Sequence, residues 1–127
     1  MSHTVELEGH VARVVTRDLA NGGIAMSMSV ATNRYWRNPS GDEQKETTWF
    51  RCTAFNKQAE GIAAVVGKGD LVYVRGRLMP DQETGTPKIW KAANGDYRAN
   101  YEVKILEFEL KEKKKHEQRA KGTRKAT

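Results

Sequence analysis

Residues 48–55 place two aromatic rings and a guanidinium on alternate positions of one short segment. The segment is rich in aromatic and β-branched residues, which favour a β-strand, and strand side chains alternate between two faces. Trp49, Arg51 and Phe55 therefore share one face, while Phe50 and Cys52 take the other, core face. Aromatic rings can stack on bases, and a guanidinium can bind phosphate. The first face is therefore a candidate nucleic-acid-binding surface. The alternative is that Trp49 and Phe55 pack under a helix or against another subunit.

A polar segment just before this strand adds a second aromatic group. Residues 32–47 are polar with turn residues at 38–42, so they are predicted to form a long hairpin loop. The loop carries Trp36 next to a tyrosine and between Arg34 and Arg37. An aromatic pair on a polar loop has little core to join, which favours base stacking over a core role.

Two later segments add further candidates. Residues 71–78 alternate as a strand, with Arg75 and Arg77 outward and with Val72, Val74, Gly76 and Leu78 inward. A solvated face is the ordinary explanation of such arginines, but beside the strand at 48–55 they would extend one basic, aromatic surface. Trp90 lies in a second long polar connection, residues 79–96, as an anchor or as a base-stacking ring.

The remaining elements complete an all-β pattern. Residues 4–11 and 24–30 alternate as half-buried strands, and residues 101–110 form a last strand with a bulge at Leu106. After Phe55, Asn56 is predicted to cap a helix in which apolar residues follow helical spacing: Ala59, Ile62, Ala63 and Val66. Five strands with one short helix between the third and fourth predict an OB-fold barrel with long hairpin loops.

Composition limits the function classes. The 127 residues suit a single domain, residues 1–110, followed by a basic tail at 111–127 that is predicted to be flexible and holds the whole formal charge of +6. The single cysteine, Cys52, excludes an intrachain disulfide, and three scattered histidines predict no metal site; no cofactor is expected. No apolar run approaches a signal core or a membrane span, so a cytoplasmic location is expected.

Five segments, taken in order, match one known pattern: Leu7-Glu8-Gly9-His10-Val11, Val30-Ala31-Thr32-Asn33, Glu46-Thr47-Thr48-Trp49-Phe50-Arg51, Ala54-Phe55-Asn56-Lys57-Gln58-Ala59-Glu60, and residues 68–78. Over residues 4–108 they resemble the bacterial-type single-stranded DNA-binding protein family. The resemblance implies non-enzymatic, sequence-independent binding of single-stranded DNA in replication, recombination and repair, and a homotetramer. It also implies that Arg51 contacts the DNA backbone and that bases stack on four aromatic residues, Trp36, Trp49, Phe55 and Trp90.

The chain departs from the family pattern at three places. Glu6 and Glu8 stand where the family has apolar residues that help to join subunits, and residues 80–89 form a longer loop. The chain ends basic where the family has an acidic tail that recruits other enzymes. Recruitment by that route is therefore expected to be absent, and the basic tail is expected either to contact DNA or to be merely solvated.

Three rival functions stay open from the sequence. A nuclease could use Glu102, Glu107 and Glu109, although Glu102 and Glu107 differ in strand parity and no catalytic residues can be assembled from spacing. An OB-fold adaptor could turn the same aromatics toward a protein. An RNA-binding protein could use the same stacking surface, because stacking does not distinguish ribose from deoxyribose.

Overall fold

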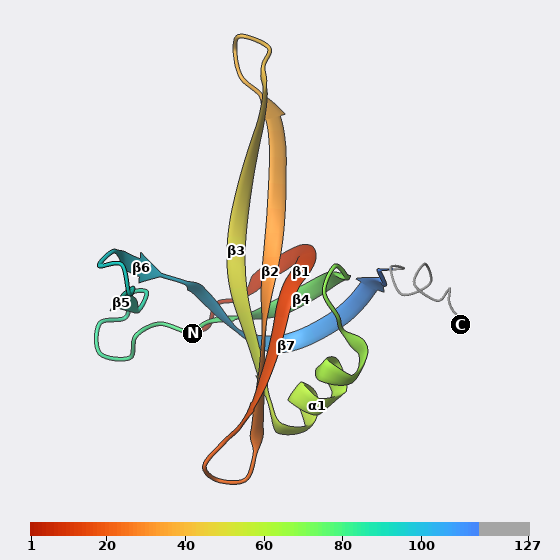
Figure 1. The fold of residues 1–127 in the computed structure, drawn as a ribbon, viewed down its shortest axis with the longest axis vertical. Coiled ribbons are helices and arrows are strands. Elements are labelled where there is room, and N and C mark those ends of the chain that lie inside the picture. The colour runs from red at the N-terminus through yellow and green to blue at the C-terminus, as the bar shows by residue number, and fades with distance from the viewer. Residues whose placement is uncertain (115–127) are drawn as a thin grey trace.

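The computed structural model describes residues 1–114, which form a closed β-barrel with two projecting hairpins (Figure 1). The elements, in chain order, are β1 (Val5–Asp18), β2 (Ile24–Arg37), β3 (Glu43–Phe55), α1 (Asn56–Val65), β4 (Leu71–Leu78), β5 (Ile89–Lys91), β6 (Tyr97–Ala99) and β7 (Tyr101–Glu112). The barrel closes in the order β1-β2-β3-β7-β4, and β5 pairs only with β6. This confirms the predicted five-stranded OB-fold barrel with one short helix between the third and fourth barrel strands.

Strand alternation places the core as predicted. Met26, Met28 and Val30 of β2 and Val72 and Val74 of β4 are buried at every second position. The barrel interior also holds Cys52, and burial raises the pKa of its thiol to about 12, so the thiol stays protonated and inert. Leu78 is the exception to the predicted inward set, because it ends β4 at the rim of the barrel and is 42% exposed.

The predicted loop at residues 32–47 is mostly strand, so that expectation was wrong. β2 and β3 stay paired from Ala25 with Phe55 to Arg37 with Glu43, and only residues 38–42 turn. Asn38 holds this turn by accepting the N–H groups of Ser40 and Asp42 on its Oδ1. The sequence looked loop-like because a ribbon that leaves the barrel covers no core and can be polar on both faces. We call this β2–β3 extension the arm (Figure 1).

The helix α1 begins differently from the prediction. Phe55 occupies the N-cap position and makes no side-chain cap, so the prediction that Asn56 caps the helix was wrong. Asn56 has a left-handed backbone (φ 54°), and its Oδ1 instead accepts the N–H of Ile24 at 3.3 Å. Ala59 and Ile62 face the barrel as predicted and are buried. No helix among residues 1–114 is long and apolar enough to cross a membrane.

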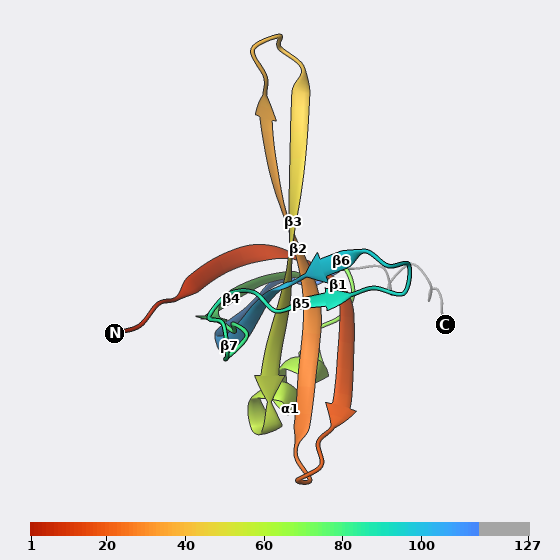
Figure 2. The ribbon, with the colours of Figure 1, turned by 90° about the vertical axis from the view of Figure 1, so that its left-hand side faces the viewer.

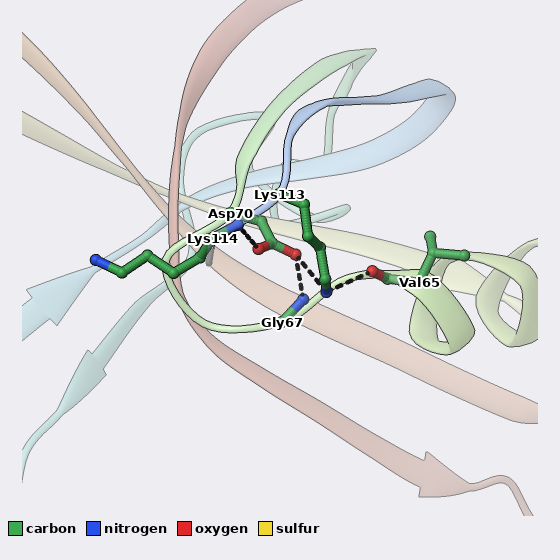
Figure 3. A network of polar contacts seen from close by, with 5 residues as sticks. All are labelled: Val65, Gly67, Asp70, Lys113 and Lys114. Carbon is green, nitrogen blue, oxygen red and sulfur yellow. Dashed lines mark hydrogen bonds and ion pairs between the residues drawn. The ribbon is translucent and has the colours of Figure 1, made fainter. Parts of the chain in front are cut away.

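Strand β7 continues past Leu110, where the sequence placed the end of the domain. β7 runs to Glu112, with a register shift at Leu106 that matches the predicted bulge. The buried Asp70 then accepts the backbone N–H of Lys114 at 2.8 Å, the N–H of Gly67 at 2.8 Å and the ammonium of Lys113 at 3.1 Å (Figure 3). Residues 111–114 are thus attached to the α1–β4 loop, and the rest of the predicted basic tail lies outside the described residues.

Candidate nucleic-acid interface

The outer face of β1, β2 and β3 forms a shallow groove between basic and aromatic side chains. Strand register sets Arg13 beside Ser29, and Ser29 beside Arg51. Because the serine side chains of β2 are small, the surface between Arg13 and Arg51 is recessed. The result is a hollow of about 400 Å³ lined by Arg13, Val15, Ser27, Ser29, Trp49, Phe50, Arg51 and Asn100.

Trp49 stands at one side of this groove with its ring open to solvent. Its exposed fraction is 53%, and it makes no aromatic or cation–π contact among residues 1–114. The alternative in which Trp49 packs under the helix does not fit this exposure, and α1 begins directly after Phe55, six residues further along the chain. An open indole beside a polar groove is suited to stacking on an unpaired base.

Two arginines border the groove with different neighbours. Arg51 Nη1 lies 3.8 Å from Glu102 Oε2, and both side chains are partly exposed. A long, solvated ion pair of this kind contributes little free energy, so the guanidinium can exchange Glu102 for a phosphate at small cost. Arg13 makes no ion pair with any acid in the described part of the chain.

The arm carries Trp36 on the other side of the β2–β3 ribbon. Ala31 pairs with Trp49 and Trp36 pairs with Gln44, so Trp36 and Trp49 differ in strand parity and point to opposite faces of the ribbon. The guanidinium carbon of Arg34 lies 4.3 Å from the Trp36 ring centroid, and Arg34 Nε lies 3.3 Å from Glu46. Arg34 is therefore held between an aromatic ring and a carboxylate, and Trp36 remains 38% exposed.

Trp90 lies on a third, separate element. β5 and β6 form a small hairpin that leaves the barrel on a different side from the arm (Figure 2). Trp90 pairs with Arg98 across this hairpin and is 44% exposed. Arg37, at the far end of the arm, donates from Nη1 to the carbonyl of Gly41 at 2.9 Å and so closes the tip. The structure thus spreads the predicted aromatic residues over the barrel wall, the arm and the β5–β6 hairpin.

The two arginines of β4 have different surroundings. β7 lies between β3 and β4, so β4 is not beside β3 as the sequence interpretation assumed. Arg75 Nε lies 2.6 Å from Glu107, and this hydrogen bond raises the pKa of the guanidinium. Arg77 pairs in register with Lys104 of β7 and shares a hollow with Phe55. Arg77 therefore lines the same hollow as Phe55, with β7 between their two strands, whereas Arg75 is paired with Glu107.

Sequence reasoning missed two basic residues of this outer face, Arg13 and Lys104. Both positions carried a signal. Arg13, Val15 and Arg17 alternate with Val14 and Thr16 beyond residue 11, and β1 indeed runs to Asp18. A register shift near Ala12 reverses the phase of the strand, so Arg13 is exposed although Val11 is buried. Lys104 is an outward position of the predicted last strand, between buried Val103 and Ile105.

The carboxylates that raised the nuclease alternative are each engaged by a cation. Glu102 faces Arg51, Glu107 faces Arg75, and Glu109 accepts from Lys111 at 2.9 Å. The bulge at Leu106 turns Glu107 to the outer face, where Glu102 also lies, but the three carboxylates do not converge. Within residues 1–114, no three His, Cys, Asp or Glu side chains gather in a way that could hold a metal ion.

Comparison with known proteins agrees with this architecture. Single-stranded DNA-binding proteins from two strains of Neisseria meningitidis, of serogroups A and B, are each 34% identical to the chain over 90 residues. These matches cover 71% of the chain and 51% of each relative, so the chain spans about half the length of these curated relatives.

Solved structures share the fold at lower identity. The small single-stranded DNA-binding protein of Streptomyces coelicolor has a TM-score of 0.69 at 21% identity, covering 87% of this chain and 94% of that one. A Plasmodium falciparum SSB, solved in complex with ssDNA, has a TM-score of 0.65 at 20% identity, covering 90% and 96%. The model of the single-strand binding protein family matches residues 2–111, which include the arm, the β5–β6 hairpin and all of the barrel except the last residue of β7. With nearly nine-tenths of its length inside that match, the chain belongs to the single-strand binding protein family.

Proposed function

We propose that this protein binds single-stranded DNA by stacking bases on exposed aromatic rings and pairing phosphates with arginines. The observation that carries the proposal is the open ring of Trp49 beside a groove bordered by Arg13 and Arg51. The family match and the relative solved with ssDNA support the choice of ligand. Trp36, Phe55 and Trp90 supply further stacking surfaces, each worth roughly 1–3 kcal/mol when a base is bound.

The mechanism predicts little sequence preference and discrimination against duplex. Every base has a π-face, so stacking on Trp49 is tolerant of sequence. In a duplex the bases are already stacked on each other and cannot also stack on protein rings. The protein then acts stoichiometrically rather than as an enzyme, protecting unpaired strands during replication, recombination and repair in the cytoplasm.

We propose a homotetramer as the assembled form, on the basis of the family alone. The outer surface at the start of β1 is polar in this chain, because Glu6 accepts a hydrogen bond from the Tyr73 hydroxyl at 2.8 Å, which raises the pKa of Tyr73. Subunits joined through this surface would therefore meet through polar contacts. Sedimentation equilibrium measures the mass directly, and a monomer at micromolar concentration would contradict the tetramer.

The decisive experiment is a tryptophan-fluorescence titration with a long oligothymidine at low and high salt. We expect deep quenching that saturates at a fixed number of nucleotides per protein and is absent with duplex. A matched oligouridine tests RNA, and equal affinity would favour a general single-strand binder. If duplex and single-stranded DNA quenched the fluorescence alike, and added salt abolished both effects equally, base stacking would be contradicted and the adaptor alternative favoured.

A further inference from the structure

We propose that Asn94 is a site of spontaneous deamidation, and that this modification loosens the β5–β6 hairpin that carries Trp90. The chain contains two Asn-Gly pairs, Asn94-Gly95 and Asn21-Gly22. Deamidation requires the next backbone nitrogen to approach the asparagine amide, and glycine has no side chain that hinders this approach. The structure places the two pairs in similar turns but on hairpins with very different support.

The reaction uses only water and the protein's own groups. The Gly95 nitrogen loses its proton and bonds to Cγ of Asn94, while the side-chain amide leaves that carbon as ammonia and takes up the proton. A cyclic succinimide remains. Water then opens the ring at either carbonyl and leaves an aspartate or an isoaspartate at position 94.

The turn around Asn94 is closed in the folded state. Gly95 donates its N–H to the Ala92 carbonyl at 2.9 Å, and Oδ1 of Asn94 accepts the N–H of Asp96 at 3.0 Å. These bonds hold the amide and the attacking nitrogen apart, so they must break before the nitrogen can reach Cγ. The rate of deamidation therefore follows the fraction of time for which the hairpin is open.

The β5–β6 hairpin has little to keep it closed (Figure 1). Each strand is three residues long, every residue of both strands is exposed, and β5 pairs only with β6. A two-stranded hairpin that covers no core is marginally stable in water. Asn94 therefore lies in a segment that opens without disturbing the barrel.

The turn around Asn21 has a firmer base. Gly22 donates its N–H to the Leu19 carbonyl at 3.0 Å, so this turn is closed in the same way. Its strands, β1 and β2, stay paired into the barrel, and Ile24 packs against the core. Asn56, at the start of α1, also accepts the N–H of Ile24 at 3.3 Å. Opening this turn disturbs the barrel itself, so Asn21 should react more slowly than Asn94.

Deamidation at position 94 turns a stabilising contact into a repulsive one. Nδ2 of Asn94 donates to Oδ2 of Asp96 at 3.1 Å, and the same Asp96 oxygen lies 3.9 Å from Nη2 of Arg98. An aspartate at position 94 lacks this donor and places a second negative charge beside Asp96. An isoaspartate also adds a carbon to the backbone within the turn. Because Arg98 is the cross-strand partner of Trp90, a loosened hairpin no longer holds the Trp90 ring in place.

Peptide mapping by mass spectrometry tests the modification. The full chain is incubated at mildly alkaline pH, which favours loss of the Gly95 proton, and trypsin then separates residues 92–98 from residues 18–34. We expect deamidation at Asn94 to be roughly tenfold or more faster than at Asn21, which corresponds to about 1.4 kcal/mol in the free energy of opening.

Incubation in urea is the control for the role of the fold. With both turns open, the two Asn-Gly pairs should react at equal rates. Equal rates in the folded protein, or faster reaction at Asn21, would overturn the proposal. A folded protein in which neither site reacts, although both react in urea, would overturn it as well.

Filter binding of oligothymidine tests the consequence, which rests on the proposed role of Trp90 in DNA binding. Trp90→Ala should weaken binding about fivefold or more. Asn94→Asp imitates one product and should lose part of that affinity, whereas Asn94→Ser cannot deamidate and should bind like the wild type. Trp90→Ala combined with Asn94→Asp should bind as tightly as Trp90→Ala alone.

Two outcomes separate this consequence from the proposed function. Additive losses in the combined variant would show that the new charge acts without Trp90, and would overturn the consequence while the proposed function stands. If the wild type does not bind oligothymidine, the proposed function fails and the effect through Trp90 fails with it. The mass measurement decides the modification in either case.

Discussion

The guanidinium carbon of Arg34 lies 4.3 Å from the centroid of the Trp36 ring, on the arm that β2 and β3 extend beyond the barrel. Arg34 also contacts Glu46, so three side chains from two strands form one stack. The guanidinium lies over the indole ring, which is still 38% exposed. An exposed cation–π contact of this kind is worth about 0.5–1 kcal/mol.

Arg34→Ala should make Trp36 more accessible to a neutral quencher. In a background where Trp49 and Trp90 are replaced by Phe, we expect a steeper acrylamide quenching slope for the free protein, because the guanidinium no longer shields the ring. Arg37→Ala is the control, since Arg37 contacts the Gly41 carbonyl and differs from Trp36 in strand parity. Equal slopes for the two variants would show that Arg34 does not cover the ring in solution.

Trp49→Ala should weaken DNA binding without affecting the fold. The side chain is half-exposed and covers no core residue, so we expect a change in unfolding free energy within about 0.5 kcal/mol. Binding to oligothymidine should lose roughly 1–3 kcal/mol. Filter binding measures the affinity without relying on tryptophan emission. Unchanged affinity, with Trp49→Phe as the conservative control, would remove Trp49 from the interface.

Protonation of Asp70 should destabilise the protein in acid. Burial of the Asp70 carboxyl opposes its ionisation, but the N–H groups of Lys114 and Gly67 and the ammonium of Lys113 outweigh burial and lower its pKa below the usual 3.8. The stabilisation is therefore fully present above about pH 4 and is lost as pH falls through the lowered pKa. Thermal melting between pH 7 and pH 2.5 should show this loss in the wild type.

The Asp70→Asn variant isolates that contribution. It should lower the unfolding free energy at pH 7 by on the order of 2 kcal/mol, because an amide accepts fewer of the three donors and has no charge for Lys113. Its melting temperature should then depend less on pH than that of the wild type below pH 4. Parallel pH curves for the two proteins would contradict the assignment to Asp70.

Truncation at two points should separate the attached end of β7 from the remaining basic tail. Deleting residues 113–127 removes the donors of Lys113 and Lys114 and should lower the melting temperature, whereas deleting 117–127 keeps both donors. The shorter deletion removes four basic residues and should flatten the salt slope by at most about 2.8 while tryptophan quenching remains. Loss of quenching on deleting 117–127 would contradict binding by the barrel.

Gly76→Ala should strongly destabilise the barrel. A Cβ at Gly76 would lie 2.3 Å from the Lys104 carbonyl oxygen, and one at Gly9 would lie 2.3 Å from the Ala31 carbonyl oxygen, so backbone strands would have to move. We expect a loss of at least about 3 kcal/mol for Gly76→Ala. The matched control is Gly61→Ala in α1, where a Cβ meets nothing within 4 Å and should stabilise the helix by roughly 1 kcal/mol. Urea unfolding of both variants provides the comparison.

Local pattern predicted much of the barrel correctly. The alternation of Met26, Met28 and Val30 identified the core face of β2, because the side-chain period of a strand depends only on the chain itself. The same reasoning placed Trp49 and Arg51 outward, and it located the bulge at Leu106 from a change of phase. Helix spacing identified Ala59 and Ile62 as the buried positions of α1.

The start of α1 and the arm were misread for a related reason. Asn56 has the residue type of a cap, but a long-range hydrogen bond to Ile24 uses its side chain instead. The polar residues of the arm resembled a loop because pairing of β2 with β3 depends on backbone hydrogen bonds, which a composition-based interpretation does not see.

The amino-acid sequence by itself determined which side of each strand carries rings and cations, since alternation is a local property of the chain. Only the tertiary structure decided which of those side chains meet. Insertion of β7 between β3 and β4 gives Arg77 the neighbours Lys104 and Phe55, while Arg75, two residues earlier, pairs with Glu107. These contacts depend on strand order and register, which are set by closing the barrel over pairs of residues that are distant in the chain.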